Sequence, residues 1–128
     1  MSVERLVLFD IDGTLLRADG AGRAAMKAAL ERVYGTAGPI GDYRFGGRTD
    51  RYTIRTLLEA AGLSARLIWS RLPEAIACME AEMRQRLTEG RHNIRPCPGA
   101  KELVARLAAH DEVLLGLLTG NFPATAAL

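Results

Sequence analysis

Apolar residues follow two different patterns along this chain. Two short continuous apolar runs, at residues 6–9 and 113–118, are too short for helices and are typical of parallel strands buried on both faces. Between them, apolar positions recur at helical spacing in residues 21–34, 50–61 and 72–87. The pattern therefore predicts an α/β protein in which a long helical region separates two strands of one parallel sheet.

Turn and cap residues divide the helical region into separate elements. Residues 36–47 hold four glycines and a proline and are expected to form a loop, after which Thr49 is a plausible N-cap. A short helix from Ser64 to Arg71 is expected next. Pro73 suits the first turn of a separate helix ending near Glu89, because proline needs no hydrogen-bonded N–H at that position.

Composition and charge narrow the class of protein. The chain has 128 residues, of which 48% are hydrophobic and 25% charged, as in ordinary globular proteins. A net charge of +2, without a basic block interleaved with aromatic residues, argues against a nucleic-acid partner. No apolar run approaches the roughly 18 residues that span a bilayer, and the first run stops at Asp10, unlike a signal peptide. We therefore expect a cytoplasmic protein with no membrane partner. None of these features indicates the oligomeric state.

Two acidic residues stand where the first apolar run ends. Asp10 and Asp12 are separated by one residue and followed by Gly13, which permits a sharp turn. In open α/β sheets, ligands bind outside the carboxyl ends of the strands, so both carboxylates are expected at the place that such a fold offers for chemistry. The alternative is a strand end whose two solvated carboxylates only close a turn.

The stretch Asp10-Ile11-Asp12-Gly13-Thr14-Leu15 resembles the first motif of the haloacid dehalogenase-like (HAD) superfamily, an apolar strand followed by Asp-x-Asp-Gly-Thr-Leu. The resemblance implies that Asp10 is a nucleophile that attacks phosphorus and that Asp12 is a general acid and base. It also implies Mg²⁺, held by the Asp10 carboxylate and the Asp12 main-chain carbonyl, because a hard cation offsets the repulsion between carboxylate and phosphate.

Two further segments are candidates for anion binding. Thr119-Gly120-Asn121 follows the second apolar run and resembles the second HAD motif, in which a hydroxyl and main-chain amides at a strand end hold phosphate oxygens. Arg48 precedes the helix expected from residue 50, where an arginine and a helix N-terminus could meet an anion. The alternative for Arg48 is an exposed surface arginine.

The resemblance also implies a division of the chain. Residues 18–90 would form an all-helical cap inserted into a Rossmann-like HAD core made of residues 1–17 and 91–128, with a core helix at residues 99–109. The later family motifs, a basic residue and further acids, have no counterpart, since no acidic residue follows Glu112. We therefore expect a truncated chain that holds the first two parallel strands of a partial core.

Within the superfamily, an acid at the position of Asp12 is typical of phosphatases, whereas dehalogenating members lack it. The resemblance thus implies a magnesium-dependent phosphatase of a small phosphorylated metabolite, similar to phosphoglycolate phosphatases, acting through an aspartyl-phosphate. Two alternatives stay open. One is a phosphosugar mutase of the same superfamily, and the other is a catalytically incomplete fragment that only binds phosphate and metal.

Overall fold

The computed structural model describes residues 2–126, which form two compact units. The α/β unit contains the chain up to Asp19 together with Asn93–Thr119, and the helical unit contains Gly20–His92 together with the segment from Gly120 onward. These limits lie within two residues of the expected boundaries at 17 and 90, whereas the segment from Gly120 groups with the helices. As an assignment of domains, the expected division stays a prediction.

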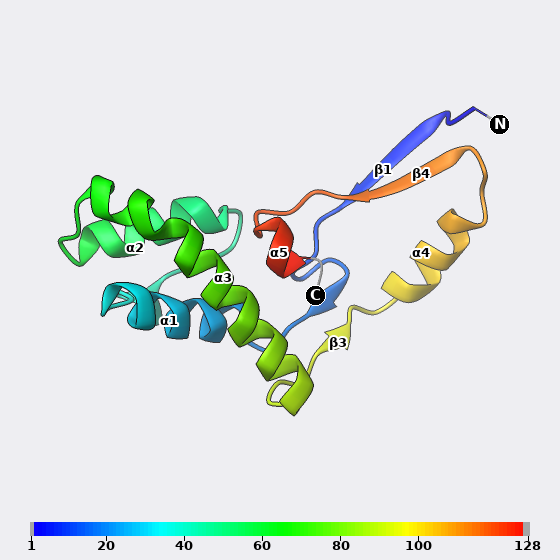
Figure 1. Ribbon diagram of the computed structural model, residues 1–128. Helices are drawn as coiled ribbons and strands as arrows, with labels where there is room; N and C mark the ends of the chain where they lie inside the picture. Colours follow the sequence, from blue (N-terminus) through cyan, green and yellow to red (C-terminus); the bar gives the residue numbers. More distant parts are fainter. Residues whose placement is uncertain (1, 127–128) are drawn as a thin grey trace. The chain divides into compact units, whose positions relative to one another are not determined.

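Three long helices build most of the helical unit. They are α1 (Ala21–Tyr34), α2 (Asp50–Ala60) and α3 (Ala65–Glu89), with a single 3-10 turn η1 (Ile40–Asp42) between α1 and α2 and a short helix α5 (Pro123–Ala126) at the end. Helix α3 packs along α1 and also contacts α5 (Figure 1). No helix among the described residues is long and apolar enough to cross a membrane.

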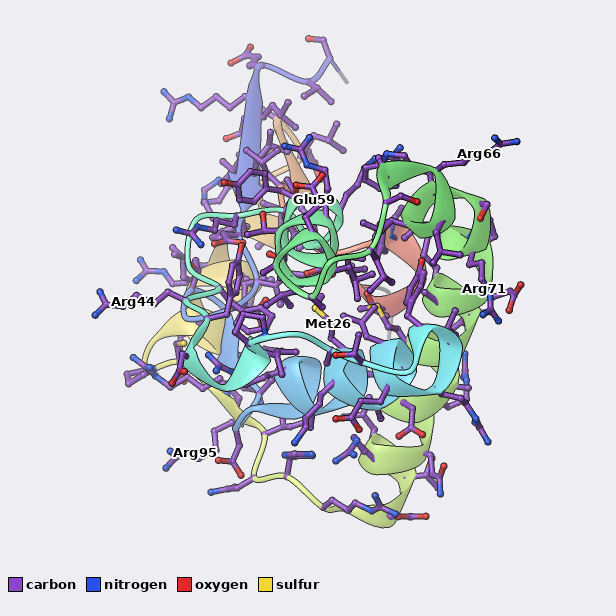
Figure 2. The ribbon with its side chains drawn as sticks, turned by 90° about the vertical axis from the view of Figure 1, so that its left-hand side faces the viewer. Met26, Arg44, Glu59, Arg66, Arg71 and Arg95 are labelled. Carbon is purple, nitrogen blue, oxygen red and sulfur yellow. The ribbon has the colours of Figure 1, made fainter. Side chains whose placement is uncertain are left out.

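The hydrophobic core lies inside the helical unit. Met26 of α1 lies between the helices, whereas Arg44, Arg66 and Arg71 extend away from them (Figure 2). Every fully buried apolar side chain of the described residues belongs to this unit, and the largest of them are Met26, Leu30, Ile54, Leu57, Leu58 and Ile68. These positions recur at the predicted helical spacing, so the apolar stripes of the three helices face one another.

Helix α3 corrects one prediction. Ser64 is its N-cap, with its hydroxyl accepting from the Leu67 N–H at 3.2 Å, but the helix then continues through Pro73 instead of ending near Arg71. The buried residues Ile68, Leu72, Ala75 and Met79 form one continuous stripe across the proline. Burial of that stripe outweighs the hydrogen bond that proline removes from a helix interior, a cost of about 3 kcal/mol.

The α1–α2 loop (residues 35–49) is fixed at one point by close backbone contact. Gly38 has φ +57°, and a Cβ there would overlap the carbonyl oxygen of Leu57. Its N–H donates to the Thr36 hydroxyl at 3.0 Å. Only glycine satisfies both the backbone conformation and the lack of space, so this loop passes α2 without a side chain between them.

The α/β unit contains a two-stranded parallel sheet and one helix. Strand β1 (Arg5–Phe9) pairs with β4 (Val113–Leu117) in a register that runs from Arg5 opposite Val113 to Phe9 opposite Leu117. Helix α4 (Ala100–Ala108) packs against β4 (Figure 1). A second pair, which the hydrophobic pattern does not predict, joins β2 (Leu16–Arg17) antiparallel to β3 (Arg95–Pro96).

The prediction that both strands are buried on two faces is wrong for this structure. Leu6, Leu114 and Leu117 of the paired strands are 59%, 53% and 53% exposed, and no described residue of the α/β unit is buried. A sheet of two strands with one helix has too few neighbours to cover both faces. The strands therefore form where the sequence predicts them and run parallel as predicted, but their apolar side chains are not buried.

Candidate functional site

The parallel register of the sheet brings two predicted site segments to the same edge. Phe9 pairs with Leu117, and the Leu118 N–H donates to the Phe9 carbonyl oxygen at 2.8 Å. Asp10 directly follows Phe9 and Thr119 directly follows Leu118, so a carboxylate and a hydroxyl leave neighbouring strands at their carboxyl ends. This is the edge at which α/β sheets bind ligands.

A tight turn shapes the chain around the two aspartates. Gly13 has φ +77° and its N–H donates to the Leu16 carbonyl oxygen at 2.8 Å, while the Leu15 N–H donates to the Ile11 carbonyl oxygen at 2.9 Å. The Asp10 carboxylate accepts from the Ile11 N–H at 2.9 Å, and both aspartates are exposed. The turn therefore leaves two solvent-accessible carboxylates at the strand end.

The strands β2 and β3 hold the two chain segments that connect the α/β unit with the helices. The Cys97 N–H donates to the Leu15 carbonyl oxygen at 2.9 Å, and the Asn93 N–H donates to the Asp19 carboxylate at 2.9 Å. Asp19 also has a positive φ of 53°, which is uncommon outside glycine. Its role was not predicted, because a single carboxylate in a polar linker gives no periodic signal.

Gly120 and Asn121 lie in the helical unit. The Asp50 N–H donates to the Gly120 carbonyl oxygen at 2.8 Å, and the Asp50 carboxylate accepts from the Phe122 N–H at 3.3 Å. A Cβ on Gly120 would lie 2.5 Å from the Arg48 carbonyl oxygen and 2.9 Å from the Thr49 Cα, so packing alone requires a glycine there. The predicted phosphate contacts of Gly120 and Asn121 stay predictions.

Arg48 lies two residues before the start of α2 and has an exposed side chain. Thr49 is the N-cap of α2, and its hydroxyl accepts from the Tyr52 N–H at 3.2 Å. Because the Asp50 N–H is bonded to Gly120, two of the first amides of α2 already have partners within the chain. An anion arriving at this end would therefore meet the Arg48 guanidinium more readily than the helix amides.

Two aromatic rings hold the Arg48 guanidinium. It lies over the ring of Tyr43, 4.9 Å from the centroid, and 6.0 Å from the centroid of Tyr52. Burial alone would raise the pKa of Tyr43, but a hydrogen bond from Thr53 and the charge of Arg48 outweigh it and lower that pKa. Hydrogen bonding and charge interaction with Tyr43 raise the pKa of Arg48, so the guanidinium stays charged.

The donor set at the strand end suits one class of metal ion. No group of three or more His, Cys, Asp or Glu side chains among residues 2–126 is arranged to hold a metal. Mg²⁺ is often bound through only one or two carboxylates, with waters and substrate phosphate oxygens completing its shell. The Asp10 carboxylate and the Asp12 main-chain carbonyl are hard oxygen donors of the kind that Mg²⁺ takes, and they do not form the closed shell that structural zinc requires.

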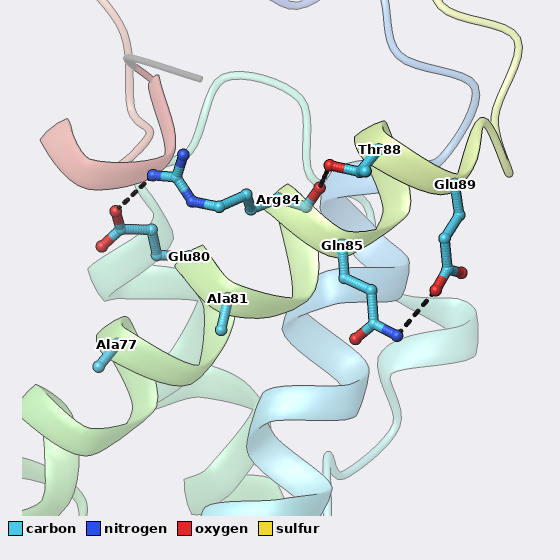
Figure 3. A pocket seen from close by; sticks show the side chains of 7 residues that line it. All are labelled: Ala77, Glu80, Ala81, Arg84, Gln85, Thr88 and Glu89. Atoms are coloured by element: carbon cyan, nitrogen blue, oxygen red, sulfur yellow. Dashed lines mark hydrogen bonds and ion pairs between the residues drawn. The ribbon is translucent and has the colours of Figure 1, made fainter.

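A surface hollow of about 560 Å³ lies elsewhere, along α3. Figure 3 shows its lining side chains on one face of that helix, where Arg84 pairs with Glu80 at 3.1 Å and Gln85 donates to Glu89 at 2.9 Å. None of the predicted site residues lines it. Its charged side chains are satisfied by neighbours one turn away, as is common on a solvated helix face.

Comparison with known protein families gives one match that spans nearly the whole chain. The model of the haloacid dehalogenase-like hydrolases matches residues 4–128. No curated protein matches the chain.

Solved structures resemble the chain as well. A Lactobacillus plantarum protein described as a phosphoglycolate phosphatase has 26% identity and a TM-score of 0.60, and the match covers 93% of this chain and 50% of that one. CbbY from Rhodobacter sphaeroides, in complex with phosphate, has 19% identity and a TM-score of 0.53, covering 96% and 53%. A Haemophilus somnus 129pt protein, also described as a phosphoglycolate phosphatase, has 18% identity and a TM-score of 0.51, covering 100% and 58%.

These matches confirm the resemblance inferred from the Asp10–Leu15 motif and the α/β fold class with an added helical part. The two structures below 25% identity support the fold alone. The chain spans between 50% and 58% of the length of the three solved structures.

Proposed function

Because the chain belongs to the haloacid dehalogenase-like hydrolase family, we propose that the protein is a magnesium-dependent phosphatase of small phosphomonoesters. The observation that carries the proposal is the parallel register of β1 with β4, in which Asp10 and Thr119 follow neighbouring strands at the same edge. The similarity to a phosphoglycolate phosphatase at 26% identity supports the same reaction class.

The two aspartates divide the proposed reaction between them. An oxygen of the Asp10 carboxylate attacks phosphorus and the bond to the leaving oxygen breaks, while Asp12 gives its proton to that oxygen. In the second half, Asp12 takes a proton from a water that attacks the aspartyl-phosphate, which releases orthophosphate and restores the Asp10 carboxylate. Exposure of both carboxylates and their separation by one residue support this division.

Thr119 and the metal complete the proposed phosphate site. The Thr119 hydroxyl would donate to a phosphate oxygen, as would the main-chain amides of Gly120 and Asn121. Mg²⁺ would be held by the Asp10 carboxylate and the Asp12 carbonyl. Its positive charge would reduce the repulsion between the phosphate and the anionic nucleophile. A carboxylate and a main-chain carbonyl are oxygen donors of the kind that Mg²⁺ takes, and both follow the end of β1.

Arg48 is the proposed contact for the rest of the substrate. Its guanidinium is exposed, charged and held over Tyr43, which suits recognition of a second anionic group by paired hydrogen bonds. The helical unit carries twelve Lys and Arg against eight Asp and Glu, a net charge of +4, whereas the α/β unit carries five against seven, a net charge of −2. The charge of the helical unit thus favours an anionic substrate.

The test is phosphate release from a panel of small phosphomonoesters, with 2-phosphoglycolate first. Both this chain and the longest product of its gene are assayed with Mg²⁺ and with a chelator. Release that requires Mg²⁺ supports the proposal. Release that is equal in the presence of the chelator contradicts the role of the metal.

The same panel separates the alternatives. If neither protein releases phosphate, but a phosphosugar is converted into its isomer, the protein is a mutase of the same family. If neither reaction occurs while inorganic phosphate binds, the chain is a binding module that keeps only the anion site.

A further inference from the structure

The α1–α2 loop is organised by one arginine of α1. The Arg23 guanidinium donates to three main-chain carbonyl oxygens of this loop, those of Ile40 at 3.1 Å, Gly41 at 3.3 Å and Tyr43 at 2.9 Å. Three such bonds from one fork-shaped group fix the first two residues of η1 and Tyr43, the residue that follows η1. The path of the loop after η1 is therefore set from α1.

The same guanidinium also holds an aromatic side chain. It stacks over the ring of Phe45, 4.6 Å from the centroid. Phe45 in turn meets Tyr43 edge to face, with ring centroids 5.3 Å apart and an interplanar angle of 89°. Arg23 thus restrains both the main chain of Tyr43 and the ring of Phe45, and the edge-to-face contact couples the two rings.

Tyr43 and Phe45, which Arg23 restrains, both contact Arg48. The Arg48 N–H donates to the Phe45 carbonyl oxygen at 3.3 Å, which closes the turn over Gly46 and Gly47. The Arg48 guanidinium lies over the Tyr43 ring, whose hydroxyl accepts from the Thr53 hydroxyl at 3.2 Å. Gly46 and Gly47 impose little conformational restraint of their own. The position of Arg48 is therefore set by its contacts with the anchored residues Tyr43 and Phe45.

We infer that Arg23 is a positioning residue for substrate recognition, which acts by holding Tyr43 and Phe45 and through them Arg48. This inference rests on the proposed function, in which Arg48 contacts the anionic group of the substrate that is not transferred. Loss of Arg23 would release the loop and weaken binding of that anionic group. The residues proposed for the reaction, Asp10 and Asp12, would be unchanged.

A purely structural role makes a different prediction. If Arg23 only stabilised the helical unit, its loss would lower activity toward all substrates alike and independently of Arg48. Two substrates distinguish the readings: 2-phosphoglycolate carries a carboxylate beside its phosphate, whereas p-nitrophenyl phosphate offers no second anionic group. The variants are Arg23→Gln, Arg23→Lys and Arg48→Ala, with Arg32→Gln as an exposed control on the same helix α1.

The experiment measures kcat and KM for both substrates in the longest product of the gene. Arg23→Gln should raise KM for 2-phosphoglycolate about fivefold or more and leave kcat for p-nitrophenyl phosphate within about twofold. Arg23→Lys should behave like Arg23→Gln, because an ammonium cannot reproduce the fork that spans three carbonyls and stacks on Phe45. Full activity in the lysine variant would contradict the geometric role.

A double variant gives the decisive comparison. If Arg23 acts through Arg48, Arg23→Gln should add less than about twofold to KM in an Arg48→Ala background. If the double variant raises KM by the product of the two single effects, the two residues act independently and the inference is overturned.

A second readout does not depend on activity. Amide hydrogen exchange of residues 40–48 should accelerate in Arg23→Gln and stay unchanged in Arg32→Gln, while α3 keeps its protection in both. If the wild-type protein releases no phosphate from any ester, the proposed function fails, and the positioning of the loop by Arg23 is then decided by exchange alone. Unchanged exchange in Arg23→Gln would overturn it.

Discussion

Leucine side chains have opposite environments in the two compact units. In the helical unit, Leu57 of α2 and Leu30 of α1 are completely buried, whereas in the α/β unit Leu114 of β4 is 53% exposed and Leu118 is 67% exposed. The residues that the family resemblance assigns to the reaction, Asp10 and Asp12, belong to the α/β unit, in which no described side chain is buried. Stability and proposed chemistry therefore reside in different parts of the chain.

The difference follows from how helices and strands bury their side chains. Three amphipathic helices cover one another's apolar stripes, so the buried residues of the core cluster all come from residues 20–92. A parallel strand has apolar side chains on both faces and requires neighbours on each side as well as layers above and below. One partner strand and α4 provide only part of that cover.

The largest expected effect is on turnover. Asp10→Asn should reduce phosphate release below detection, because an amide cannot act as the nucleophile that forms the phosphoryl intermediate. Its stability should change by no more than about 0.5 kcal/mol, since the side chain is exposed and the amide oxygen can still accept from the Ile11 N–H. Chemical denaturation is measured beside the rate.

The matched control is Asp111→Asn, an exposed carboxylate just before β4, at the other end of the strand pair. It should retain full turnover. Activity that survives in Asp10→Asn would remove Asp10 as the nucleophile, and unfolding of that variant would break the separation between stability and chemistry.

The next effect concerns the second aspartate. Asp12→Asn should slow turnover by a factor of about 10² to 10⁴, the usual contribution of a general acid and base. Esters with better leaving groups need less protonation, so the loss should be smaller for p-nitrophenyl phosphate than for 2-phosphoglycolate. An equal rate for variant and wild type would remove the assignment of Asp12.

A pair of leucine substitutions tests the comparison directly. Leu57→Ala should cost about 2 to 5 kcal/mol of unfolding free energy, as expected for a fully buried leucine. Leu114→Ala should cost no more than about 0.5 kcal/mol, because its side chain is half in water. Denaturant unfolding of this chain provides both values.

The same two substitutions, Leu57→Ala and Leu114→Ala, are also measured in the longest product of the gene. If Leu114→Ala costs more than about 2 kcal/mol there, other segments cover the strand in that product. Equal costs for Leu57→Ala and Leu114→Ala in this chain would contradict the contrast between the two units.

The smallest effect is a dependence of stability on pH. The Tyr34 hydroxyl donates to the Ile68 carbonyl oxygen at 2.7 Å, and burial raises the pKa of Tyr34. The folded state then keeps the tyrosine proton at pH values where the unfolded chain loses it, so stability should fall as the pH rises above about 10. Tyr34→Phe should lack this part of the decline, and Tyr52→Phe, at an exposed tyrosine, should keep it.

Denaturation curves recorded between about pH 8 and pH 11 measure this difference. At neutral pH, Tyr34→Phe should cost about 0.5 to 1.5 kcal/mol through the lost hydrogen bond to Ile68. Parallel pH profiles for wild type and Tyr34→Phe would show that the Tyr34 hydroxyl is equally solvated in the folded and unfolded chain.

The elements that could be predicted are those with a periodic pattern. Helix α1 has the predicted bounds, α2 ends one residue before the predicted Ala61, and both apolar runs form strands that pair in parallel. Pro73 shows why local preference was insufficient, because a buried stripe on both sides of the proline keeps α3 continuous. Strands β2 and β3 were missed, since two residues each are too few for any pattern.

The candidate site could be predicted only where its residues follow a periodic apolar pattern. Asp10, Asp12 and Thr119 follow apolar runs, and their place at one sheet edge depends on the parallel pairing that those runs favour. Arg23 gave no signal, because its hydrogen-bond partners are main-chain carbonyls, which are the same in every residue, and only the fold brings its ring partner Phe45 near. Asp50 likewise binds main-chain groups of Gly120 and Phe122 that only the fold brings near.

The close passage of Gly38 over α2 has a consequence for protein engineering. A library that diversifies the α1–α2 loop to change substrate preference should recover no functional replacement at Gly38, since any side chain would displace the main chain of Leu57. Gly41 and Gly46 have open space around them and no left-handed backbone, so they should tolerate many residues. The loop that is proposed to present Arg48 therefore combines one glycine that cannot be replaced, Gly38, with two glycine positions that can be varied, Gly41 and Gly46.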